Sequence, residues 1–279
     1  MADSPGAAAT LIEVAPNVLV WRDPTPGRAH PNAGVVIDED AATVIDALPG
    51  PSAAKILHDQ LERLGQRVRR VVVTSSHVEH VGGSSVFTMA GFYGSAVASE
   101  NLDLPPNVRG NQLRLPEYAP EYDDEFTTRP ISHTVDQAAY LSATAIAVPT
   151  AGQQALNLVV QVPHVNIVFA GAMCSFGETP LCFDGDPAGW ADNLEQLFTL
   201  GQIIVPGHGD VGGHDEVRAL QGYLRACVAA GGDAGAIGPG PWDDWSGREW
   251  DVVNVERAAM LAAGDFAPPP SMLRALGLG

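Results

Sequence analysis

The chain has 279 residues, and 46% of them are hydrophobic, which suits one large α/β domain with a sizeable core. Its formal net charge of -18, from 33 acidic and 15 basic residues, argues against a nucleic-acid partner. We find no apolar run long enough to cross a bilayer and no signal peptide, so we expect a cytoplasmic protein without a membrane partner. Three cysteines without a Cys-x-x-Cys pair favour a reducing compartment.

The first part of the chain predicts strands joined by tight turns, together with one amphipathic helix. The apolar residues of that helix recur at helical spacing, and Gly65 follows it as a stop. In chain order, the predicted elements are a strand, turn and strand over 11–21, a hairpin over 32–46 that turns at Glu39 and Asp40, a helix over 51–64, a strand buried on both faces over 69–74, and the start of a helix at 81–87.

The second part of the chain predicts further strands and then helices. In chain order, these are strands over 140–148, 156–162 and 165–170, a helix over 188–200, a strand over 202–205, a helix over 215–230 and a tail helix near 253–263. Two β-rich halves, each followed by helices, indicate a layered sandwich with sheets inside and helices outside.

The domain boundaries follow from composition. Residues 1–230 are expected to form one domain, in which 103–130 is an insertion or lid, because its prolines, acids and tyrosines show no clear period. Residues 231–279 read as a Gly/Pro-rich linker and a C-terminal helical tail that packs on the same domain.

The segment that carries chemistry is 74–83, Thr-Ser-Ser-His-Val-Glu-His-Val-Gly-Gly, which directly follows a predicted buried strand. Its turn presents His77, Glu79 and His80 together, as imidazoles and a carboxylate must be in order to converge on one ion. His208, in Pro-Gly-His-Gly after another predicted buried strand, is a further candidate ligand.

This segment resembles the signature H-x-H-x-D-H-x-G-G of the metallo-β-lactamase superfamily, and the Gly-His around His208 resembles a later motif of that family. The order of the strands is similar over nearly the whole chain. The resemblance implies the α/β fold of that family, an αβ/βα four-layer sandwich.

The resemblance also implies which site residues are kept and which are replaced. Three histidines of the family pattern are retained, namely His77, His80 and His208. The replaced ligands fall on Ser75 (a histidine in the family), Glu79 (an aspartate), Gln153 (a histidine) and Ala172 (the bridging aspartate).

The first metal site of the family is therefore reduced to His77, while the second keeps Glu79, His80 and His208. Two histidines and a carboxylate suffice for one catalytic zinc, and they also match the non-haem iron pattern. We expect either one zinc or iron ion at these three residues, with His77 as an additional candidate ligand, or a metal-free centre.

Both states suit an enzyme that acts on a small carbonyl compound, either as a hydrolase of an ester, thioester or lactone or as a cyclase/lyase-type enzyme. Without a metal, the histidines and Glu79 form an acid–base cluster, and Ser75 and Gln153 hold an oxyanion through hydrogen bonds. The candidate catalytic residues are His77, Glu79, His80, Ser75 and Gln153.

The C-terminal segments 250–260 and 268–273 loosely resemble the tails of metallo-β-lactamase-like cyclase/thioesterases of aromatic polyketide pathways. This weaker resemblance implies polyketide biosynthesis and a small-molecule substrate that a carrier can tether. The alternative is a non-catalytic small-molecule binding or regulatory protein on a degenerate fold, which the loss of ligands at Ser75, Gln153 and Ala172 favours.

Overall fold

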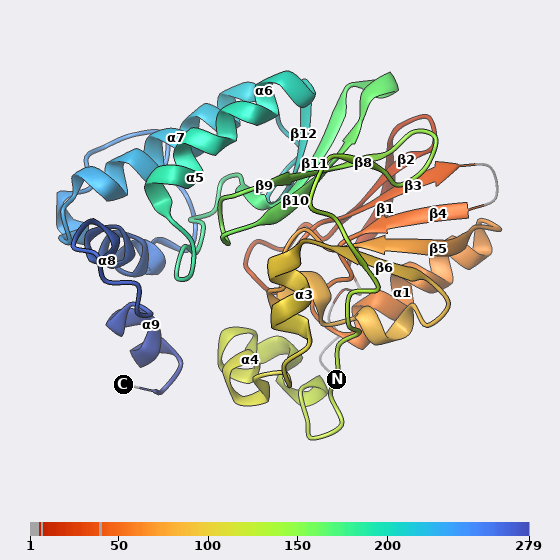
Figure 1. The fold of residues 1–279 in the computed structure, drawn as a ribbon, viewed down its shortest axis with the longest axis horizontal. Coiled ribbons are helices and arrows are strands. Elements are labelled where there is room, and N and C mark those ends of the chain that lie inside the picture. Colours follow the sequence, from red (N-terminus) through yellow and green to blue (C-terminus); the bar gives the residue numbers. More distant parts are fainter. Residues whose placement is uncertain (1–5, 7, 39–40, 279) are drawn as a thin grey trace.

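A computed structural model describes residues 6, 8–38 and 41–278, and it contains two β-sheets between layers of helices (Figure 1). The first sheet has the strand order β1 to β7. Its strands are β1 (Thr10–Ala15), β2 (Val18–Arg22), β3 (Ala33–Asp38), β4 (Ala41–Ile45), β5 (Arg67–Val72), β6 (Gly91–Gly94) and β7 (His133–Thr134). The second sheet runs in the order β12 (Ile203–His208), β11 (Ile167–Ser175), β10 (Asn157–Val162), β9 (Ile146–Thr150) and β8 (Ala139–Tyr140).

The helices lie on the outer faces of the two sheets, α1 beside the first sheet and α5, α6 and α7 beside the second (Figure 1). The α-helices are α1 (Pro51–Arg63), α2 (Val78–Val81), α3 (Ala96–Leu102), α4 (Val108–Arg114), α5 (Pro187–Asn193), α6 (Leu197–Leu200), α7 (His214–Ala229), α8 (Asp251–Ala262) and α9 (Pro270–Ala275). The four-layer sandwich predicted from the family resemblance is thus confirmed. In residues 6, 8–38 and 41–278, the helices are all too short or too polar to cross a membrane.

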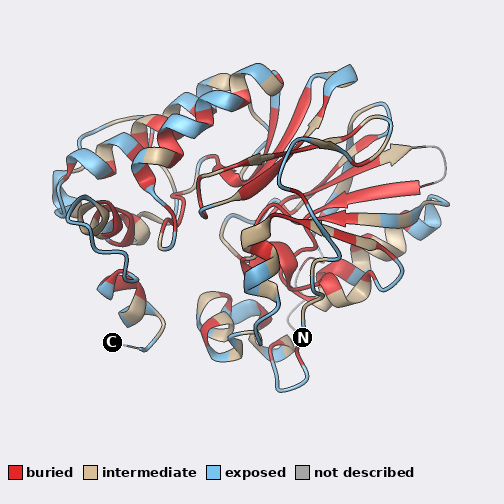
Figure 2. Ribbon diagram, viewed as in Figure 1, coloured by how far each residue is buried: buried red, intermediate tan, exposed pale blue. Residues whose placement is uncertain are grey.

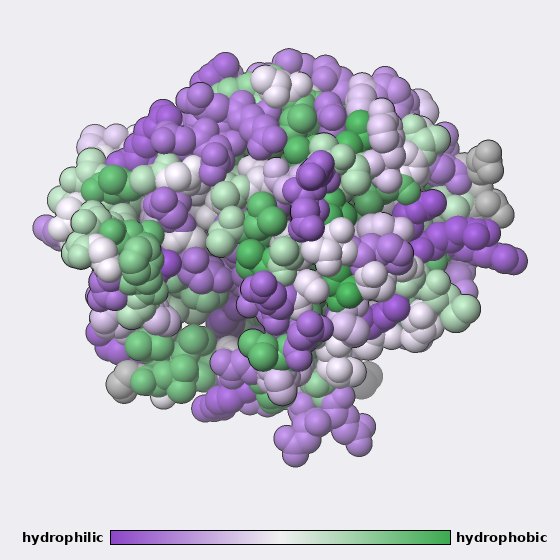
Figure 3. All heavy atoms as spheres, viewed as in Figure 1, coloured by the Kyte–Doolittle hydropathy of each residue, from purple (hydrophilic) through white to green (hydrophobic). Residues whose placement is uncertain are grey.

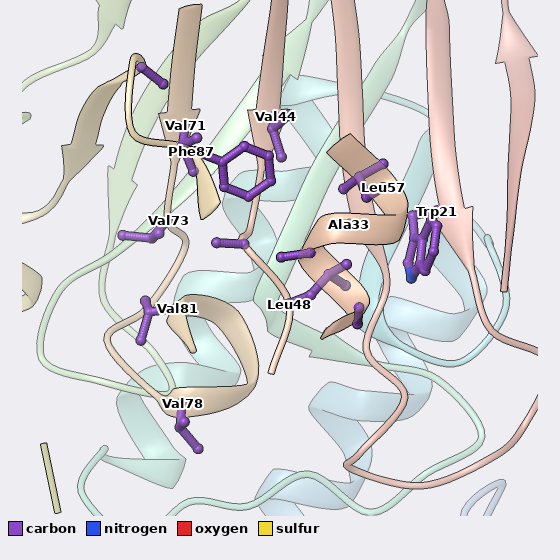
Figure 4. Close-up of a cluster of buried hydrophobic side chains, with 14 of the residues drawn as sticks. Trp21, Ala33, Val44, Leu48, Leu57, Val71, Val73, Val78, Val81 and Phe87 are labelled. Atoms are coloured by element: carbon purple, nitrogen blue, oxygen red, sulfur yellow. The ribbon is translucent and has the colours of Figure 1, made fainter. Parts of the chain in front are cut away.

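Three apolar layers hold the sandwich together. The layer between the first sheet and α1 includes Trp21, Leu57, Val71 and Phe87, which are labelled in Figure 4. A second layer fills the space between the two sheets, and a third packs the second sheet against α5 and α7. Burial of this kind is the dominant favourable term in folding, and the buried residues follow the inner faces of strands and helices in Figure 2.

The two sheets approach closely at Gly34 in β3. A Cβ atom at this position would lie 2.4 Å from the ring of Phe169 in β11, so only glycine allows this packing. The visible outer surface is mostly hydrophilic, as the net charge leads one to expect, and hydrophobic residues gather near α9 (Figure 3).

Strand pairing places the ends of particular strands side by side. β4 and β5 run parallel, so the residues that follow them, Asp46 and Thr74, lie at the same edge of the first sheet. β11 and β12 also run parallel and pair Ser175 with His208 at their carboxyl ends. The candidate site residues of the sequence motifs therefore lie together at one edge of the sandwich.

Several predicted elements differ from the observed ones. In place of the helix expected at 81–87, the structure has the short helix α2 and then a 3₁₀ turn at Ser84–Val86. The chain bends here because Gly82 and Gly83 lie against residues 47–50. A Cβ atom at Gly82 would come within 1.7 Å of Pro49 O. The predicted strand 140–148 is divided into β8 and β9 by a turn that the backbone bond from Leu141 N–H to Ala145 C=O closes.

The other predicted elements agree in position within a few residues. The strand expected over 69–74 is β5, and only its last residues are fully buried, since its arginines reach solvent. The turn predicted at 39–40 lies outside the described residues. The 103–130 segment contains α4 and a 3₁₀ helix at Pro116–Glu121, and the tail helix α8 packs against α5 and α7.

Candidate functional site

The centre of the site is built on the turn between β5 and α2. Asp46 accepts hydrogen bonds from the backbone N–H of Thr74 (2.7 Å) and from its hydroxyl (2.8 Å). The same carboxylate accepts the Nδ1–H of His80 at 2.8 Å. Asp46 has a positive φ of 66°, a backbone conformation that residues other than glycine rarely adopt. The surrounding hydrogen bonds hold the backbone in this conformation. Asp46 thus fixes the ring of His80 so that Nε2 is free.

His208, at the end of β12, lies beside His80, and the two ring centroids are 6.1 Å apart. His80 Nε2 and both ring nitrogens of His208 are buried and have no hydrogen-bond partner among the described residues. Glu79, His80 and His208 each place one ligand atom within 4.8 Å of the others. Unpaired buried nitrogens are costly, so this arrangement suits a group that the nitrogens can bind.

The pKa values of His80 and His208 are shifted in opposite directions. Burial above all, together with nearby Arg28, lowers the pKa of His208 to about 3. Burial also disfavours a charged His80, but the attraction and hydrogen bond of Asp46 outweigh it and raise the pKa of His80. His208 is therefore neutral at pH 7, which is the form that binds metals.

Glu79 is completely buried between two arginines. Arg114 Nη2 donates to both carboxylate oxygens, at 2.8 and 3.0 Å, and Arg28 Nη1 lies 4.0 Å from Oε1. Burial alone would raise the pKa of Glu79, but Arg114 above all holds it well below its usual range. Burial also lowers the pKa of Arg28 to about 10, so this arginine remains charged at neutral pH.

His77, the N-cap of α2, forms a pair with a residue that the sequence motifs did not indicate. Its Nε2 lies 3.0 Å from Asp184 Oδ2, and its ring stacks on Phe183 with centroids 4.9 Å apart. Burial would raise the pKa of Asp184, but the neighbouring His77 lowers it. Gln154 Nε2 also donates to Asp184 Oδ2 at 3.2 Å. His77 Nδ1 lies 4.0 Å from Glu79 Oε1.

These residues line two neighbouring pockets. A small cavity of about 10 Å³, close to the space that one water or ion needs, is lined by Arg28, His80, Gln153, Ala172 and His208, among others. A larger pocket of about 280 Å³ is lined by His77, Arg114, Phe183, Asp184 and residues of α3 and α4, among others. The candidate catalytic residues His77, His80 and Gln153 are therefore divided between these two pockets, and Ser75 and Glu79 line neither.

The residues that the family resemblance marked as replaced ligands make other contacts. Ser75 is buried, and its Oγ accepts the backbone N–H of His77 at 3.0 Å, so it shapes the turn. Gln153 is buried with its Oε1 unpaired among the described residues. Ala172 donates its backbone N–H to Thr74 Oγ1 at 3.0 Å, which ties the second sheet to the turn.

Sequence reasoning missed Arg28, Arg114 and Asp184. None of them lies in a motif, and the partners of Arg114 and Asp184 are 35 and 107 residues away in the sequence. Asp184, Arg28 and Arg114 carry no local sequence signal beyond their charge.

The donor set of Glu79, His80 and His208 fits one zinc ion by chemistry, since it offers two free imidazoles and a carboxylate. The carboxylate is shared, however, because both of its oxygens already accept from Arg114. The first site of the family does not fit, because Ser75 and Gln153 offer no imidazole.

Comparisons with known proteins agree with this fold. The structure is similar to that of the metallo-β-lactamase FIM-1 from Pseudomonas aeruginosa in its mono-zinc form, with 17% identity, a TM-score of 0.63 and coverage of 78% of this chain and 96% of that one. It is also similar to a metallo-β-lactamase from Erythrobacter litoralis with β-mercaptoethanol in its active site, with 17% identity, a TM-score of 0.62 and coverage of 78% and 97%. The family profile described as "Metallo-beta-lactamase superfamily" matches residues 26–270. This chain therefore belongs to the metallo-β-lactamase superfamily, whose members usually bind zinc and are mostly hydrolases.

Proposed function

We propose that this chain is an enzyme that acts on the carbonyl group of a small molecule, at a centre that holds at most one metal ion. The reaction is hydrolysis of an ester, thioester or lactone, or a cyclisation or dehydration of the polyketide type. A carrier-tethered thioester is one version of such a substrate. One observation carries the proposal. A buried set of possible ligands, Glu79, His80 and His208, lies next to the His77–Asp184 pair, and this pair lines a pocket of about 280 Å³.

His77 is the residue that we expect to move the proton. The Asp184 carboxylate accepts its Nε2–H, which leaves a lone pair on Nδ1 for a general base. Arg114 lines the same pocket, and its buried Nε–H has no partner among the described residues. A guanidinium in this place can stabilise negative charge that develops on a substrate oxygen.

Glu79, His80 and His208 are the residues that would hold a single zinc ion, or an iron ion of the same ligand preference. When bound, such an ion polarises a carbonyl group and acidifies water. Gln153 lines the same small cavity as His80 and His208 and can offer its amide N–H there. Because Arg114 and Arg28 already neutralise Glu79, the charge balance of the centre does not require a metal.

The second candidate function is small-molecule binding without catalysis. The engagement of both Glu79 oxygens by Arg114 favours it, as does the loss of ligands at Ser75, Gln153 and Ala172. The same pocket would then serve recognition alone. Turnover of a substrate separates the two functions.

The test is hydrolysis of activated esters, thioesters and lactones by the protein with chelator and with added zinc. We expect His77→Ala to lower kcat/KM by about 100-fold or more and Asp184→Asn by about tenfold, since general acid–base catalysis contributes at least this much. His164→Ala, at an exposed position, is the matched control and should leave the rate unchanged.

Two outcomes would contradict the proposal. A wild-type rate in His77→Ala would exclude His77 as the base. Saturable binding of these compounds without turnover, in the presence and absence of zinc, would support the binding function instead.

A further inference from the structure

Arg114 is the last residue of α4 and belongs to the 103–130 segment, which the family motifs do not include. Its guanidinium reaches the one carboxylate of the candidate ligand set. Nη2 lies 3.0 Å from Oε1 and 2.8 Å from Oε2 of Glu79. The guanidinium therefore binds the same oxygens that a metal ion would need.

A buried carboxylate requires a positive partner. Glu79 is fully buried, and the other arginine near it, Arg28, lies 4.0 Å away and is partly exposed. Removing one member of a buried ion pair leaves the other charge uncompensated, which is strongly unfavourable. Arg114 thus provides most of the compensation that an ion provides in a metal-loaded site.

The segment around Arg114 is fixed to the body of the domain. Glu121 accepts the backbone N–H of Ser52 at the start of α1 (2.9 Å), and Tyr122 donates its hydroxyl to Pro49 O (2.9 Å). The guanidinium of Arg114 also lies over the ring of Phe183, 5.3 Å from its centroid. These contacts hold the guanidinium against Glu79 before any ligand arrives.

We propose that Arg114 is the resident counter-ion of Glu79 and competes with a divalent cation for it, so that the 103–130 segment sets the affinity of the centre for metal. The inference rests on the proposed function, since it concerns the same centre. A cation gains Glu79 only when Arg114 gives up its hydrogen bonds. Removal of the guanidinium therefore strengthens metal binding, although it removes a contact.

The test is zinc affinity, measured by competition with a chromophoric chelator and without any substrate. We expect Arg114→Met to bind zinc about tenfold or more tightly than the wild type, because a buried, unpaired carboxylate then gains a partner. Arg109→Met is the matched control, since Arg109 is exposed on the same helix, and it should bind zinc as the wild type does. The double variant Glu79→Gln with Arg114→Met should lose the gain.

An unchanged or weaker zinc affinity in Arg114→Met, or a gain that survives Glu79→Gln, would overturn the inference. If Arg114→Met is unfolded without metal, zinc-dependent folding followed by circular dichroism supports the inference, and a chain that stays unfolded in zinc contradicts it. Ester turnover by the chelator-treated wild type is measured separately, so failure of this inference is distinguishable from failure of the proposed function.

Discussion

At the scale of single residues, the chemistry of the centre depends on which neighbour each histidine meets. His80 donates to the carboxylate of Asp46, and that contact favours its charged form. His208 is buried without a hydrogen-bond partner among the described residues and lies near Arg28, so its neutral form is favoured. The pKa values of two neighbouring imidazoles are thus shifted in opposite directions.

The state of His208 predicts how stability depends on pH. In the chelator-treated protein, burial lowers the pKa of His208 to about 3 in the folded state, whereas the unfolded chain has the ordinary histidine pKa of 6.5. Between these values the unfolded chain binds the extra proton, so stability is full above pH 6.5 and falls as the pH decreases. The slope from this group approaches about 1.4 kcal/mol per pH unit.

The measurement is urea denaturation from pH 7 to pH 5, with the wild type compared with His208→Gln, which cannot titrate. We expect the wild type to lose about 2 kcal/mol more than His208→Gln over this range. His133→Gln, at an exposed position, is the control and should follow the wild type. Parallel pH profiles for wild type and His208→Gln would show that His208 is not buried in its neutral form.

At the scale of elements, the C-terminal helix α8 supports the site from behind. Asn254 is fully buried, accepts the N–H of Cys182 (2.8 Å) and donates to Pro180 O (2.7 Å). Arg257 donates to Gly185 O at 2.9 Å. The segment 180–185 between these contacts carries the phenyl ring and the carboxylate that hold His77.

We therefore predict that Asn254→Ala weakens both stability and activity. It leaves a buried N–H and a buried C=O without partners, which costs about 2–3 kcal/mol in the free energy of unfolding. Val252→Ala, at an exposed position on the same helix, is the control. Urea denaturation and kcat/KM check the two effects, and wild-type stability in Asn254→Ala would contradict the support that we assign to α8.

The elements that could be predicted from the sequence are those with a local pattern. The helix α1 has its apolar residues on one face, and the turn at 74–83 has its motif within ten residues. Arg114 and Asp184 could not be predicted, because they reach Glu79 and His77 through contacts across the fold. The helix expected at 81–87 was wrong because close packing of Gly82 depends on another part of the chain.

At the scale of the whole molecule, the two sheets bring their carboxyl edges together and place the centre where both end. Glu79 and His80 lie in the short helix α2 that follows the first sheet's β5, and His208 lies at the end of the second sheet's β12. A ligand bound to all three residues would therefore join the two halves of the sandwich. Binding to the folded state alone stabilises it in proportion to the affinity.

We propose that the centre holds at most one metal ion. Elemental analysis of protein purified without chelators and without a histidine tag, with His208→Ala in parallel, measures the number of ions. We predict no more than one zinc or iron per chain in the wild type after incubation with metal, and loss of that ion in His208→Ala. Two ions per chain, or one ion retained in His208→Ala, would contradict the account.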